Sequence, residues 1–510
     1  MQPKTTPAKK TESKKSADES ADTTAASKRR QPVKLLRGMK DILPEQQNYR
    51  HAVQKALEDI AVSYSYQRID TPILEFASLF SKSLGQTTDV VDKEMYVFED
   101  KSGDKVSLRP EFTAGIARAY IEHGMLNRTQ PVKLFTTGQL FRHDRPQAGR
   151  YRQFNQIDCE IIGGRAPIID AELIVVAHSL LKELGVNSTV RINSIGSEED
   201  REQYINELVS YLKNNRRKLS EESKKRLTKN PLRVLDSKDE QDQLVIAEAP
   251  QIVDWLSEDS KNYFITVLEY LDDIGIPYVL EPTLVRGLDY YNDIVFELYD
   301  ENEVQGSQSA LAGGGRYDGL IELLGGQPAG ACGFAIGIER LILAMKANRI
   351  GFSEAYIPDV FLAQLGKSAQ KYSLGLMERL RGDGFKVRAN LVKGSLSAQL
   401  KAANKIGSRF TLIIGQKELL DGTIIMRDME SGSQEIIDIK KISDELKKRL
   451  QKEPDELIPK VIGPQDEPVE LENEDPRKPG NQNRNKNQNQ NQNQEVKTTQ
   501  DKDTGKKKSK

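Results

Sequence analysis

The chain has 510 residues, which is enough for two or three domains with substantial cores. Its 75 lysines and arginines are balanced by 76 acidic residues, which excludes a global cationic field for nucleic acid and leaves only local surfaces for that purpose. Two cysteines far apart in the sequence, Cys159 and Cys332, exclude a disulfide framework and indicate a reducing compartment.

The histidines and the apolar residues set two further limits. None of the four histidines has metal-ligand spacing with another histidine or with a cysteine, so we expect no zinc site. No apolar run reaches the roughly 18 residues of a membrane span, and the N-terminal residues lack the apolar segment of a secretory signal. We therefore expect no membrane partner and a cytoplasmic location.

Both ends of the chain are polar. Residues 1–32 have almost no aromatic or branched apolar content, and residues 451–510 include the low-complexity run NQNRNKNQNQNQNQ, so we expect both ends to be disordered. Order is predicted to start in VKLLRGMKDILPEQ. An amphipathic helix over about 47–64 follows, and then a short strand that breaks at Pro72.

EMYVFED and KVSLRPEFTAGIARAYIEHG predict a hairpin that runs into a helix, for which Thr113 is the expected cap. Arg109 and Glu111 fall at the junction between strand and helix. Charged residues at such a junction often line sites, although a local Arg–Glu pair is an almost equally good interpretation.

The stretch 134–163, LFTTGQLFRHDRPQAGRYRQFNQIDCEIIG, predicts two strands joined by a hairpin with four arginines. Strand alternation places polar or acidic side chains on one face and apolar ones on the other, respectively Gln156, Asp158, Glu160 and Ile157, Cys159, Ile161. Carboxylates are seldom buried beside arginines for purely structural reasons, because unpaired buried charge is costly. We therefore expect this stretch to form the floor of a site for a polyanionic substrate.

A helix over about 170–184 and the strand TVRINS come next. Residues from about 197 to 275 are highly charged, poor in glycine and helical in spacing, which predicts a helical insertion in a sheet domain. The basic run 213–229 within it reads more readily as a solvated helix face than as a phosphate site.

Three sheet-like blocks follow the insertion. The first, PYVLEPTLVRGLDYYNDIVFELYD, is predicted to be one long strand that carries an arginine and two tyrosines. The other two, ALAGGGRYDGLIELLG and GACGFAIGIERLILAM, are strands rich in glycine. Because glycine within a strand marks close approach of a ligand or of another backbone, we interpret these glycines as evidence for a bound ligand.

After Pro358, apolar strands alternate with helices as far as residue 450. This pattern predicts a small, largely parallel α/β domain. The fold class predicted for the chain is therefore α+β, with a sheet domain over 33–357 and an α/β domain over 358–450.

The chemistry-bearing residues are dispersed arginines. Neither a P-loop nor a dinucleotide fingerprint is present, whereas arginines recur on predicted strands, at Arg109, Arg142, Arg150, Arg286 and Arg340. Guanidinium groups suit a nucleoside triphosphate and the charge that develops at phosphorus. Glu111, Asp158 and Glu160 are candidates for binding a substrate ammonium or Mg²⁺. With no Ser–His or Cys–His pairing, the predicted site works by positioning and electrostatics.

These blocks resemble the class II aminoacyl-tRNA synthetases, and specifically the histidyl-tRNA synthetase family. RIDTPILE resembles motif 1, FRHDRPQAGRYRQFNQIDCEIIG motif 2 and GFAIGIERL motif 3, while RGMKDILP resembles the family's N-terminal sequence. LVRGLDYY and AGGGRYDGL resemble the histidine-specific blocks and are highly specific as a pair. The resemblance covers about 34–450 and implies an antiparallel-sheet catalytic domain followed by an anticodon-binding domain.

The implied reaction is histidine–tRNA ligation, in which ATP (with Mg²⁺) and L-histidine give histidyl-adenylate and pyrophosphate, and histidine then passes to the 3′ end of its tRNA. The implied partners are histidine, ATP, the acceptor stem and anticodon of the histidine tRNA, and a second copy of the chain in a homodimer.

The resemblance also implies roles for individual residues. Arg142 and Arg340 are expected to hold the ATP phosphates and adenine, and Arg286 to bridge the substrate carboxylate and the α-phosphate. Arg150 is expected to contact ATP in a loop that also faces the tRNA acceptor end. The remaining expected positions surround histidine: Glu111, Thr113 and Gln156 at its amino group, and Glu160, Tyr290 and Tyr291 at its imidazole. In a regular strand Arg286 and Tyr290 share a face and Tyr291 does not, so a twist or bulge is required.

Two departures from the family pattern are Asp144, where motif 2 more often has Glu, and Phe112, at a position that is often smaller. One alternative function is the non-catalytic synthetase-like regulatory subunit of ATP phosphoribosyltransferase. Such proteins typically lack the anticodon domain and the histidine-activating arginine, whereas this chain has both. A nucleotide-binding or RNA-binding module is a second alternative, but it would not require the complete set of site residues.

Overall fold

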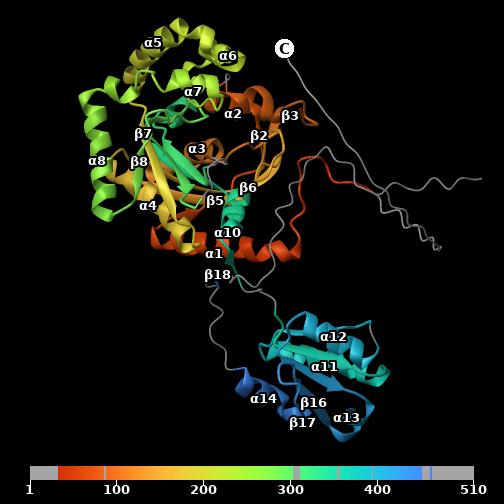
Figure 1. Ribbon diagram of the computed structural model, residues 1–510. Coiled ribbons are helices and arrows are strands. Elements are labelled where there is room, and N and C mark those ends of the chain that lie inside the picture. The colour runs from red at the N-terminus through yellow and green to blue at the C-terminus, as the bar shows by residue number, and fades with distance from the viewer. Residues whose placement is uncertain are drawn as a thin grey trace, which may run out of the picture. The chain divides into compact units, whose positions relative to one another are not determined.

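A computed structural model describes residues 33–85, 88–302, 310–352, 357–392, 394–450 and 460–461 (Figure 1). The expectations for residues 1–32 and for most of 451–510 lie outside these described residues. No described helix is long and apolar enough to cross a membrane.

The largest element is an eight-stranded sheet with the order β1-β5-β6-β11-β10-β9-β7-β8. Its strands are β1 (Gln67–Arg68), β5 (Val132–Phe141), β6 (Gln153–Ile162), β7 (Ser188–Ser194), β8 (Tyr278–Leu280), β9 (Asn292–Asp300), β10 (Ala312–Arg316) and β11 (Ala331–Gly337). Only the two edge pairs, β1 with β5 and β7 with β8, are parallel, and the five inner pairs are antiparallel. The predicted antiparallel sheet is confirmed.

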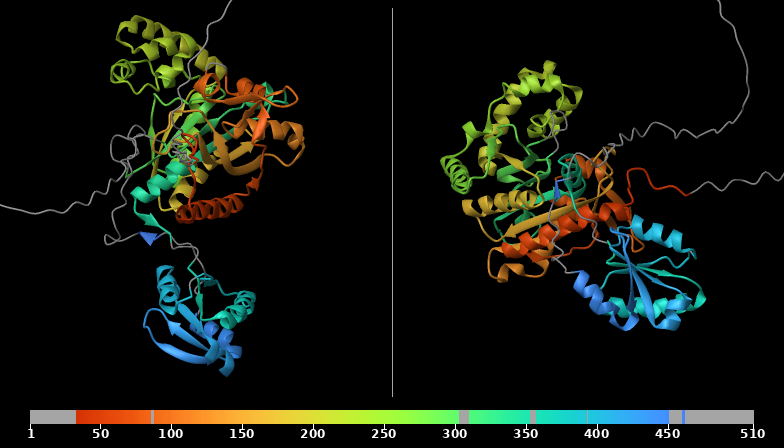
Figure 2. Two further views of the ribbon diagram at one scale, coloured as in Figure 1. Left: turned by 90° about the vertical axis from the view of Figure 1, so that its right-hand side faces the viewer. Right: turned by 60° about the horizontal axis from the view of Figure 1, so that its bottom comes forward.

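Helices cover one face of this sheet (Figures 1 and 2). They are α1 (Gln47–Ser63), α4 (Pro167–Glu183), α8 (Glu258–Ile274) and α10 (Ile338–Ala347). Ile157, Cys159 and Ile161 of β6 point into the apolar core beneath them, as the alternation predicts. The polar residues of β6 therefore face the other side of the sheet.

A smaller three-stranded sheet, of order β2-β4-β3, precedes the long hairpin. It comprises β2 (Leu74–Phe76), β3 (Tyr96–Glu99) and β4 (Lys105–Leu108), with α2 (Ala77–Ser83) next to β2. After β4 the chain enters α3 (Thr113–Glu122), so the predicted hairpin followed by a helix is confirmed. Phe112, Ile116 and Tyr120 of this region lie in a second apolar core, on the polar side of the large sheet.

The charged segment after β7 folds into helices, which Figure 1 shows grouped together. They are α5 (Glu198–Asn214), α6 (Glu221–Lys229), α7 (Glu240–Ile246) and α8. Ser197, Ser220 and Ser257 cap α5, α6 and α8 by accepting hydrogen bonds from backbone N–H groups of the first turns.

The prediction of one long strand after the insertion is wrong. The chain forms β8 and then β9, and residues 281–291 between them are irregular. Pro282 lacks the N–H group that a strand ladder requires, and Gly287 favours a break. Arg286, Tyr290 and Tyr291 consequently precede β9 and lie in a loop.

The second domain has a five-stranded sheet with the order β14-β13-β15-β16-β17. Its elements are β13 (Val360–Gln364), α11 (Lys367–Gly382), β14 (Val387–Ala389), α12 (Leu396–Lys405), β15 (Phe410–Ile414), α13 (Gln416–Asp421), β16 (Thr423–Asp428), β17 (Gln434–Asp438) and α14 (Ile442–Arg449). Two strand pairs are parallel and two are antiparallel, which corrects the expectation of a largely parallel sheet. A tight turn with Gly432 at φ +74° makes β17 return beside β16.

Candidate active site

A pocket of about 880 Å³ opens on the polar side of the large sheet. Nine of the ten predicted site residues line it, namely Glu111, Thr113, Arg142, Arg150, Gln156, Arg286, Tyr290, Tyr291 and Arg340. The tenth, Glu160, is buried next to the pocket at 1% exposure. The fold thus gathers residues spread over more than two hundred positions into one cavity.

Three arginines at one side of the pocket have little neutralising charge around them. Arg340 donates to the backbone oxygen of Ala310 at 3.2 Å, and Arg142 donates its Nε to that of Pro110 at 2.9 Å. Among the described residues, only Arg150 of the three has an ion pair within 4 Å, with Asp144 at 3.3 Å. Burial and repulsion from Arg150 and Arg142 lower the pKa of Arg340. A polyanion would relieve this repulsion.

An aromatic ring completes the arginine side of the pocket. The guanidinium carbon of Arg142 lies 5.4 Å from the centre of the Phe154 ring, and both residues line the cavity. Sequence reasoning missed Phe154. It lies two residues before Gln156 on β6, so the strand period could have identified it.

A carboxylate on β9, that of Glu297, holds the side chain of Arg286 in place. Its Nη1 donates to Oε1 of Glu297, while the hydroxyl of Tyr299 donates to Oε2 of Glu297 at 2.6 Å. Burial opposes the charge of Arg286, but the Glu297 carboxylate outweighs it and raises the pKa of the guanidinium. Nε of Arg286 is buried without a hydrogen-bond acceptor. This donor is therefore available to a ligand.

Three buried acidic side chains, Glu111, Asp158 and Glu160, lie close to one another. Burial raises the pKa of each, and repulsion from Glu160 raises that of Asp158 further. The hydrogen bond between Asp158 and Glu160 favours neutral Asp158 and charged Glu160, so Asp158 is the donor and Glu160 the acceptor. Burial raises the pKa of Glu160 to about 7, so Glu160 loses its proton only near neutral pH, and Asp158 loses its proton above its usual range.

Two carboxylate oxygens of this group have no partner. Oε1 of Glu111 accepts from the backbone N–H of Ala114 at 2.9 Å, but Oε2 is buried and unpaired. Oε2 of Glu160 accepts from the hydroxyl of Tyr317, but Oε1 is unpaired. A buried acceptor without a donor costs about 1–3 kcal/mol, which a ligand with N–H groups would recover.

Three tyrosines pack together around Glu160. The ring centres of Tyr290 and Tyr291 are 4.7 Å apart, and Tyr317 lies 5.4 Å from Tyr290 in an edge-to-face arrangement. Sequence reasoning missed Tyr317 as a site residue. Its position in the specific block AGGGRYDGL was the available signal.

The strand glycines make room for the pocket's own side chains. A Cβ on Gly313 would lie 2.5 Å from Nη1 of Arg286, and one on Gly315 would lie 3.0 Å from the ring of Tyr291. A Cβ on Gly333 would collide with the carboxylate of Glu160. The inference of close approach is thus right, but protein side chains and not a ligand directly occupy the space.

Two local expectations at the entry to α3 are wrong. Arg109 neither pairs with Glu111 nor lines the pocket, and instead donates to the backbone oxygens of Thr71 at 2.6 Å and Gln139 at 3.0 Å. The side chain that caps α3 belongs to Glu111 and not to Thr113. Because Glu111 precedes the helix, its carboxylate can reach the free N–H groups of the first turn.

Comparisons with known proteins agree on one family. Residues 38–341 match the family model Histidyl-tRNA synthetase, and residues 359–449 match the model Anticodon binding domain. A histidine–tRNA ligase of Dehalococcoides mccartyi is 45% identical over 415 residues, which are 81% of this chain and 99% of that protein.

Solved structures give the same result. The apo histidyl-tRNA synthetase of S. aureus is 36% identical with a TM-score of 0.69, and the match covers 82% of this chain and 100% of that one. A Bacillus halodurans structure described as an ATP phosphoribosyltransferase regulatory subunit/histidyl-tRNA synthetase is 21% identical with a TM-score of 0.56, over 76% of this chain and 99% of that one. The latter similarity concerns the fold alone.

Proposed function

The chain belongs to the histidyl-tRNA synthetase family, and on that premise we propose how its pocket carries out the family's reaction. The activity is histidine–tRNA ligation: L-histidine and ATP give histidyl-adenylate and pyrophosphate, and the histidyl group then passes to the 3′ end of its tRNA. The regulatory-subunit alternative has no support, because the similarity to the histidine–tRNA ligase of Dehalococcoides mccartyi covers 99% of that protein and 81% of this chain.

One observation supports the proposed residue roles. A single cavity joins a cluster of poorly neutralised arginines to a buried group of acids and tyrosines with unpaired polar atoms. The first half suits a triphosphate, and the second suits a small cation-bearing substrate with ring N–H groups.

In the histidine half, the ammonium group is proposed to bind Glu111, Thr113 and Gln156. The unpaired Oε2 of Glu111 supports this role, since an ammonium group supplies the missing donor. The imidazole is proposed to lie between Glu160 and the tyrosines, with a ring N–H donating to the unpaired Oε1 of Glu160.

Tyr317 joins the imidazole subsite as a positioning residue. Its hydroxyl donates to Oε2 of Glu160 and so fixes the direction of the opposite oxygen. The protonated carboxyl group of Asp158 is proposed as a second hydrogen-bond donor to Glu160. Glu160 is held from two sides before any substrate binds.

In the ATP half, Arg142, Arg150 and Arg340 are proposed to bind the phosphates, and Phe154 together with Arg340 to hold the adenine. Among the described residues these guanidinium groups have few carboxylate partners, so phosphate oxygens are their natural counter-charges.

The adenylate step needs no nucleophile from the protein. An oxygen of the histidine carboxylate attacks the α-phosphorus, the bond from that phosphorus to the bridging oxygen breaks, and pyrophosphate leaves with the electron pair. Arg286 is proposed to touch both the carboxylate and the α-phosphate, where its buried Nε–H is unpaired. It aligns the reactants and stabilises the charge that accumulates at phosphorus.

Mg²⁺ is proposed to enter bound to the ATP phosphates. The described residues contain no group of three or more His, Cys, Asp or Glu side chains placed to hold a metal ion. We therefore propose an ion whose ligands are mainly phosphate oxygens and water. When bound, Mg²⁺ neutralises charge on the pyrophosphate group.

The domain boundaries are proposed as 33–357 for the catalytic domain, with its helical insertion at about 197–275, and 358–450 for the anticodon-binding domain. Separate apolar cores support the division, because residues 360–450 form clusters of their own. Arg150 is proposed to face the acceptor end of the tRNA, since it lies in the half-exposed loop of the long hairpin.

The homodimer is proposed to form through the three-stranded sheet β2-β4-β3. Its apolar side chains are unusually exposed for a sheet, at 58% for Phe76, 49% for Val97 and 46% for Phe98. Val97→Asp is expected to give a monomer in light scattering, whereas Leu420→Asp, on an 81% exposed side chain of the second domain, should leave the dimer intact. Equal masses for both variants would contradict this interface.

A cytoplasmic location is proposed on two grounds. Cys159 and Cys332 are free and buried, which suits a reducing compartment. Synthesis of charged tRNA for translation also takes place there.

L-Histidinol, which has a hydroxymethyl group in place of the carboxylate, separates the proposed roles. Glu160→Gln should weaken binding of both histidine and histidinol in calorimetry, because both carry the imidazole. Arg286→Gln should abolish most adenylate formation, by about 10²–10³-fold, yet leave histidinol binding unchanged. The roles would be refuted by an Arg286 variant that activates histidine normally, or by a Glu160 variant that binds histidinol normally.

A further inference from the structure

Two tyrosines near Glu160 are each followed in the chain by a polar segment. Tyr291 precedes Asn292 and Asp293, and Tyr317 precedes Asp318. Neither aspartate lines the pocket. Asp293 lies two residues after Tyr291, and Asp318 directly follows Tyr317. Their contacts therefore act on the tyrosines through the backbone.

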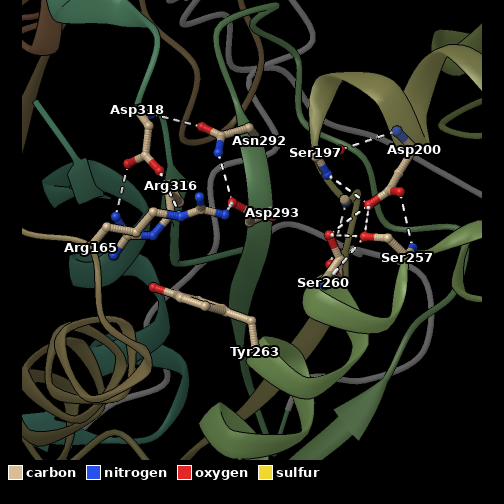
Figure 3. Close-up of polar contacts among 12 residues, drawn as sticks. Arg165, Ser197, Asp200, Ser257, Ser260, Tyr263, Asn292, Asp293, Arg316 and Asp318 are labelled. Carbon is tan, nitrogen blue, oxygen red and sulfur yellow. Dashed lines mark hydrogen bonds and ion pairs between the residues drawn. The ribbon is translucent and has the colours of Figure 1, made fainter. Parts of the chain in front are cut away.

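Arg165 bridges these two carboxylates (Figure 3). Its Nη2 lies 3.0 Å from Oδ2 of Asp293, and its Nε lies 3.4 Å from Oδ2 of Asp318. The guanidinium also stands 5.6 Å from the ring centre of Tyr263 on helix α8 of the insertion. One side chain, from the loop between β6 and α4, thus holds segments that are more than a hundred residues further along the chain.

Asp293 has a backbone conformation that needs such support. Its φ is +48°, which costs a residue other than glycine on the order of 1 kcal/mol. The pairing of β9 with β10 shifts at this point, from Gly315 opposite Val295 to Arg316 opposite Asn292. This irregularity lies two residues after Tyr291, where the loop that carries Tyr290 and Tyr291 enters β9. Because both tyrosines lie in that loop and not in a regular strand, they need no strand bulge to face one site.

The second segment is tied to the first by a direct hydrogen bond and is held by two further ones. The backbone N–H of Asp318 donates to the side-chain oxygen of Asn292 at 2.7 Å. Oδ1 of Asp318 accepts from the backbone N–H of Ala331 and from Nη1 of Arg316, each at 2.8 Å. Tyr317, between Arg316 and Asp318, is thereby fixed on both sides.

Arg316 anchors the whole group in the core. It is fully buried and donates to Asp170 of α4, which also accepts from the hydroxyl of Tyr263 at 2.6 Å. A buried ion pair of this kind is weak evidence for stability, because desolvation offsets much of the attraction. The pair matters here because it fixes the position of Arg316, which directly precedes Tyr317 in the chain.

We propose that Arg165, Asp293 and Asp318 are positioning residues that set the affinity for histidine, by holding Tyr291 and Tyr317 against Glu160. The proposal rests on the assignment of Glu160 and these tyrosines to the imidazole subsite. It assigns Arg165, which does not line the pocket, a role in recognition of the amino acid and none in binding ATP.

The same domain contains a matched control network. Asp200 accepts from the hydroxyl groups of Ser257 at 3.1 Å and Ser260 at 2.6 Å and from the backbone N–H of Ser197 at 3.2 Å, so that it joins the first turns of α5 and α8 (Figure 3). Asp200 and Asp293 are both buried, at 4% and 1% exposure. The hydrogen bonds of the Asp200 carboxylate go to Ser197, Ser257 and Ser260 and not to either tyrosine segment, although the neighbouring Arg201 donates to the backbone oxygen of Tyr291 at 2.5 Å.

The experiment measures the KM for histidine, the KM for ATP and the melting temperature of the full chain by pyrophosphate exchange and calorimetry. Arg165→Gln and Asp293→Asn should raise the KM for histidine by about tenfold, the change expected when a charge-assisted hydrogen bond is lost, and leave the KM for ATP unchanged. Arg165→Lys should recover part of the loss. Asp200→Asn should lower the melting temperature, leave the KM for ATP unchanged, and raise the KM for histidine by less than Asp293→Asn does, because its own carboxylate contacts neither tyrosine segment.

Arg165 is more than half exposed, at 54% of its side chain, so its variants are expected to fold even if Asp293→Asn does not. An unchanged histidine KM in Arg165→Gln would overturn the proposal, as would equal rises in the KM for both substrates. Tyr317→Phe distinguishes the two levels of the argument. If it also leaves the histidine KM unchanged, the imidazole subsite itself is wrong; if it raises that KM while Arg165→Gln does not, only the positioning role fails.

Discussion

At the residue scale, several side chains of the free pocket have unfavourable interactions that bound substrates are expected to relieve. Arg340 repels neighbouring arginines, and Glu111 and Glu160 each keep one buried oxygen unpaired. Such groups reduce the stability of the free protein and gain their partners on binding. Affinity and instability therefore have the same physical origin here.

Asp158 and Glu160 should make the stability of the free protein fall as the pH rises. Their pKa values are higher in the folded chain than in the unfolded one, so the folded state binds more protons above the ordinary carboxyl range of about 4. Their contribution is complete below that range and is lost as the pH rises through the raised values. Asp158→Asn should flatten this decline in urea unfolding measured from about pH 5 to about pH 9.

The matched control for that titration is Glu322→Gln, which removes an exposed carboxyl group from the same domain. It should retain the pH dependence of the parent chain. Identical slopes for the parent and Asp158→Asn would contradict the raised pKa values of this pair.

The location of the shared proton gives a separate prediction about histidine. Asn at position 158 still donates a hydrogen bond to Glu160, as protonated Asp158 does, so the KM for histidine should change little. Gln at position 160 loses the charged acceptor, and its KM should rise by about tenfold or more. The pattern would be reversed if Asp158 carried the negative charge.

At the element scale, β10 shows how a strand without side chains makes space for a site. Gly313 faces Arg286, Gly314 packs against the backbone of Gly333, and Gly319, after the strand, faces open space. These three positions belong to one short block, yet they meet different neighbours.

Alanine at each of the three glycines should therefore have a distinct effect. Gly313→Ala should fold but lose about 10²-fold in adenylate formation, because Arg286 is displaced. Gly314→Ala should lose about 1–3 kcal/mol or more of stability, since backbone atoms cannot move aside easily, and Gly319→Ala should change neither property. Exchange rates and denaturant midpoints for the three variants test this order, and a fully active Gly313→Ala would contradict it.

Local patterns predicted most of the elements and most of the pocket. The alternation along β6 identified the polar face correctly, because a strand has a strict period of two. The segment after β7 was predicted to be helical because it is charged, poor in glycine and has apolar residues at helical spacing. Residue roles came from the resemblance to a family, which periodicity alone cannot supply.

What local patterns could not predict depends on contacts between distant segments. The loop that carries Arg286 looked like a strand, because its apolar and aromatic residues have strand propensity and only its neighbours reveal the break. Arg165 contacts Asp293 across 128 positions, and no short-range signal marks that pair. The antiparallel half of the second sheet likewise follows from turns whose consequences appear only in three dimensions.

At the scale of the whole molecule, the two sets of apolar cores predict that adenylate formation and tRNA charging can be separated. Residues 360–450 have clusters of their own, apart from those beneath the large sheet. A chain that ends at residue 357 should thus keep most of its adenylate formation and lose most of its tRNA charging. The two activities measured on the same preparation test this division, and equal losses would contradict it.

This pocket is proposed to activate histidine and no other amino acid. Pyrophosphate exchange into ATP, measured on the purified full-length chain with each standard amino acid in turn, tests it most directly. Exchange is expected to depend on L-histidine and to be abolished by Arg286→Gln. A folded protein that shows no exchange with histidine, or equal exchange with another amino acid, would contradict it.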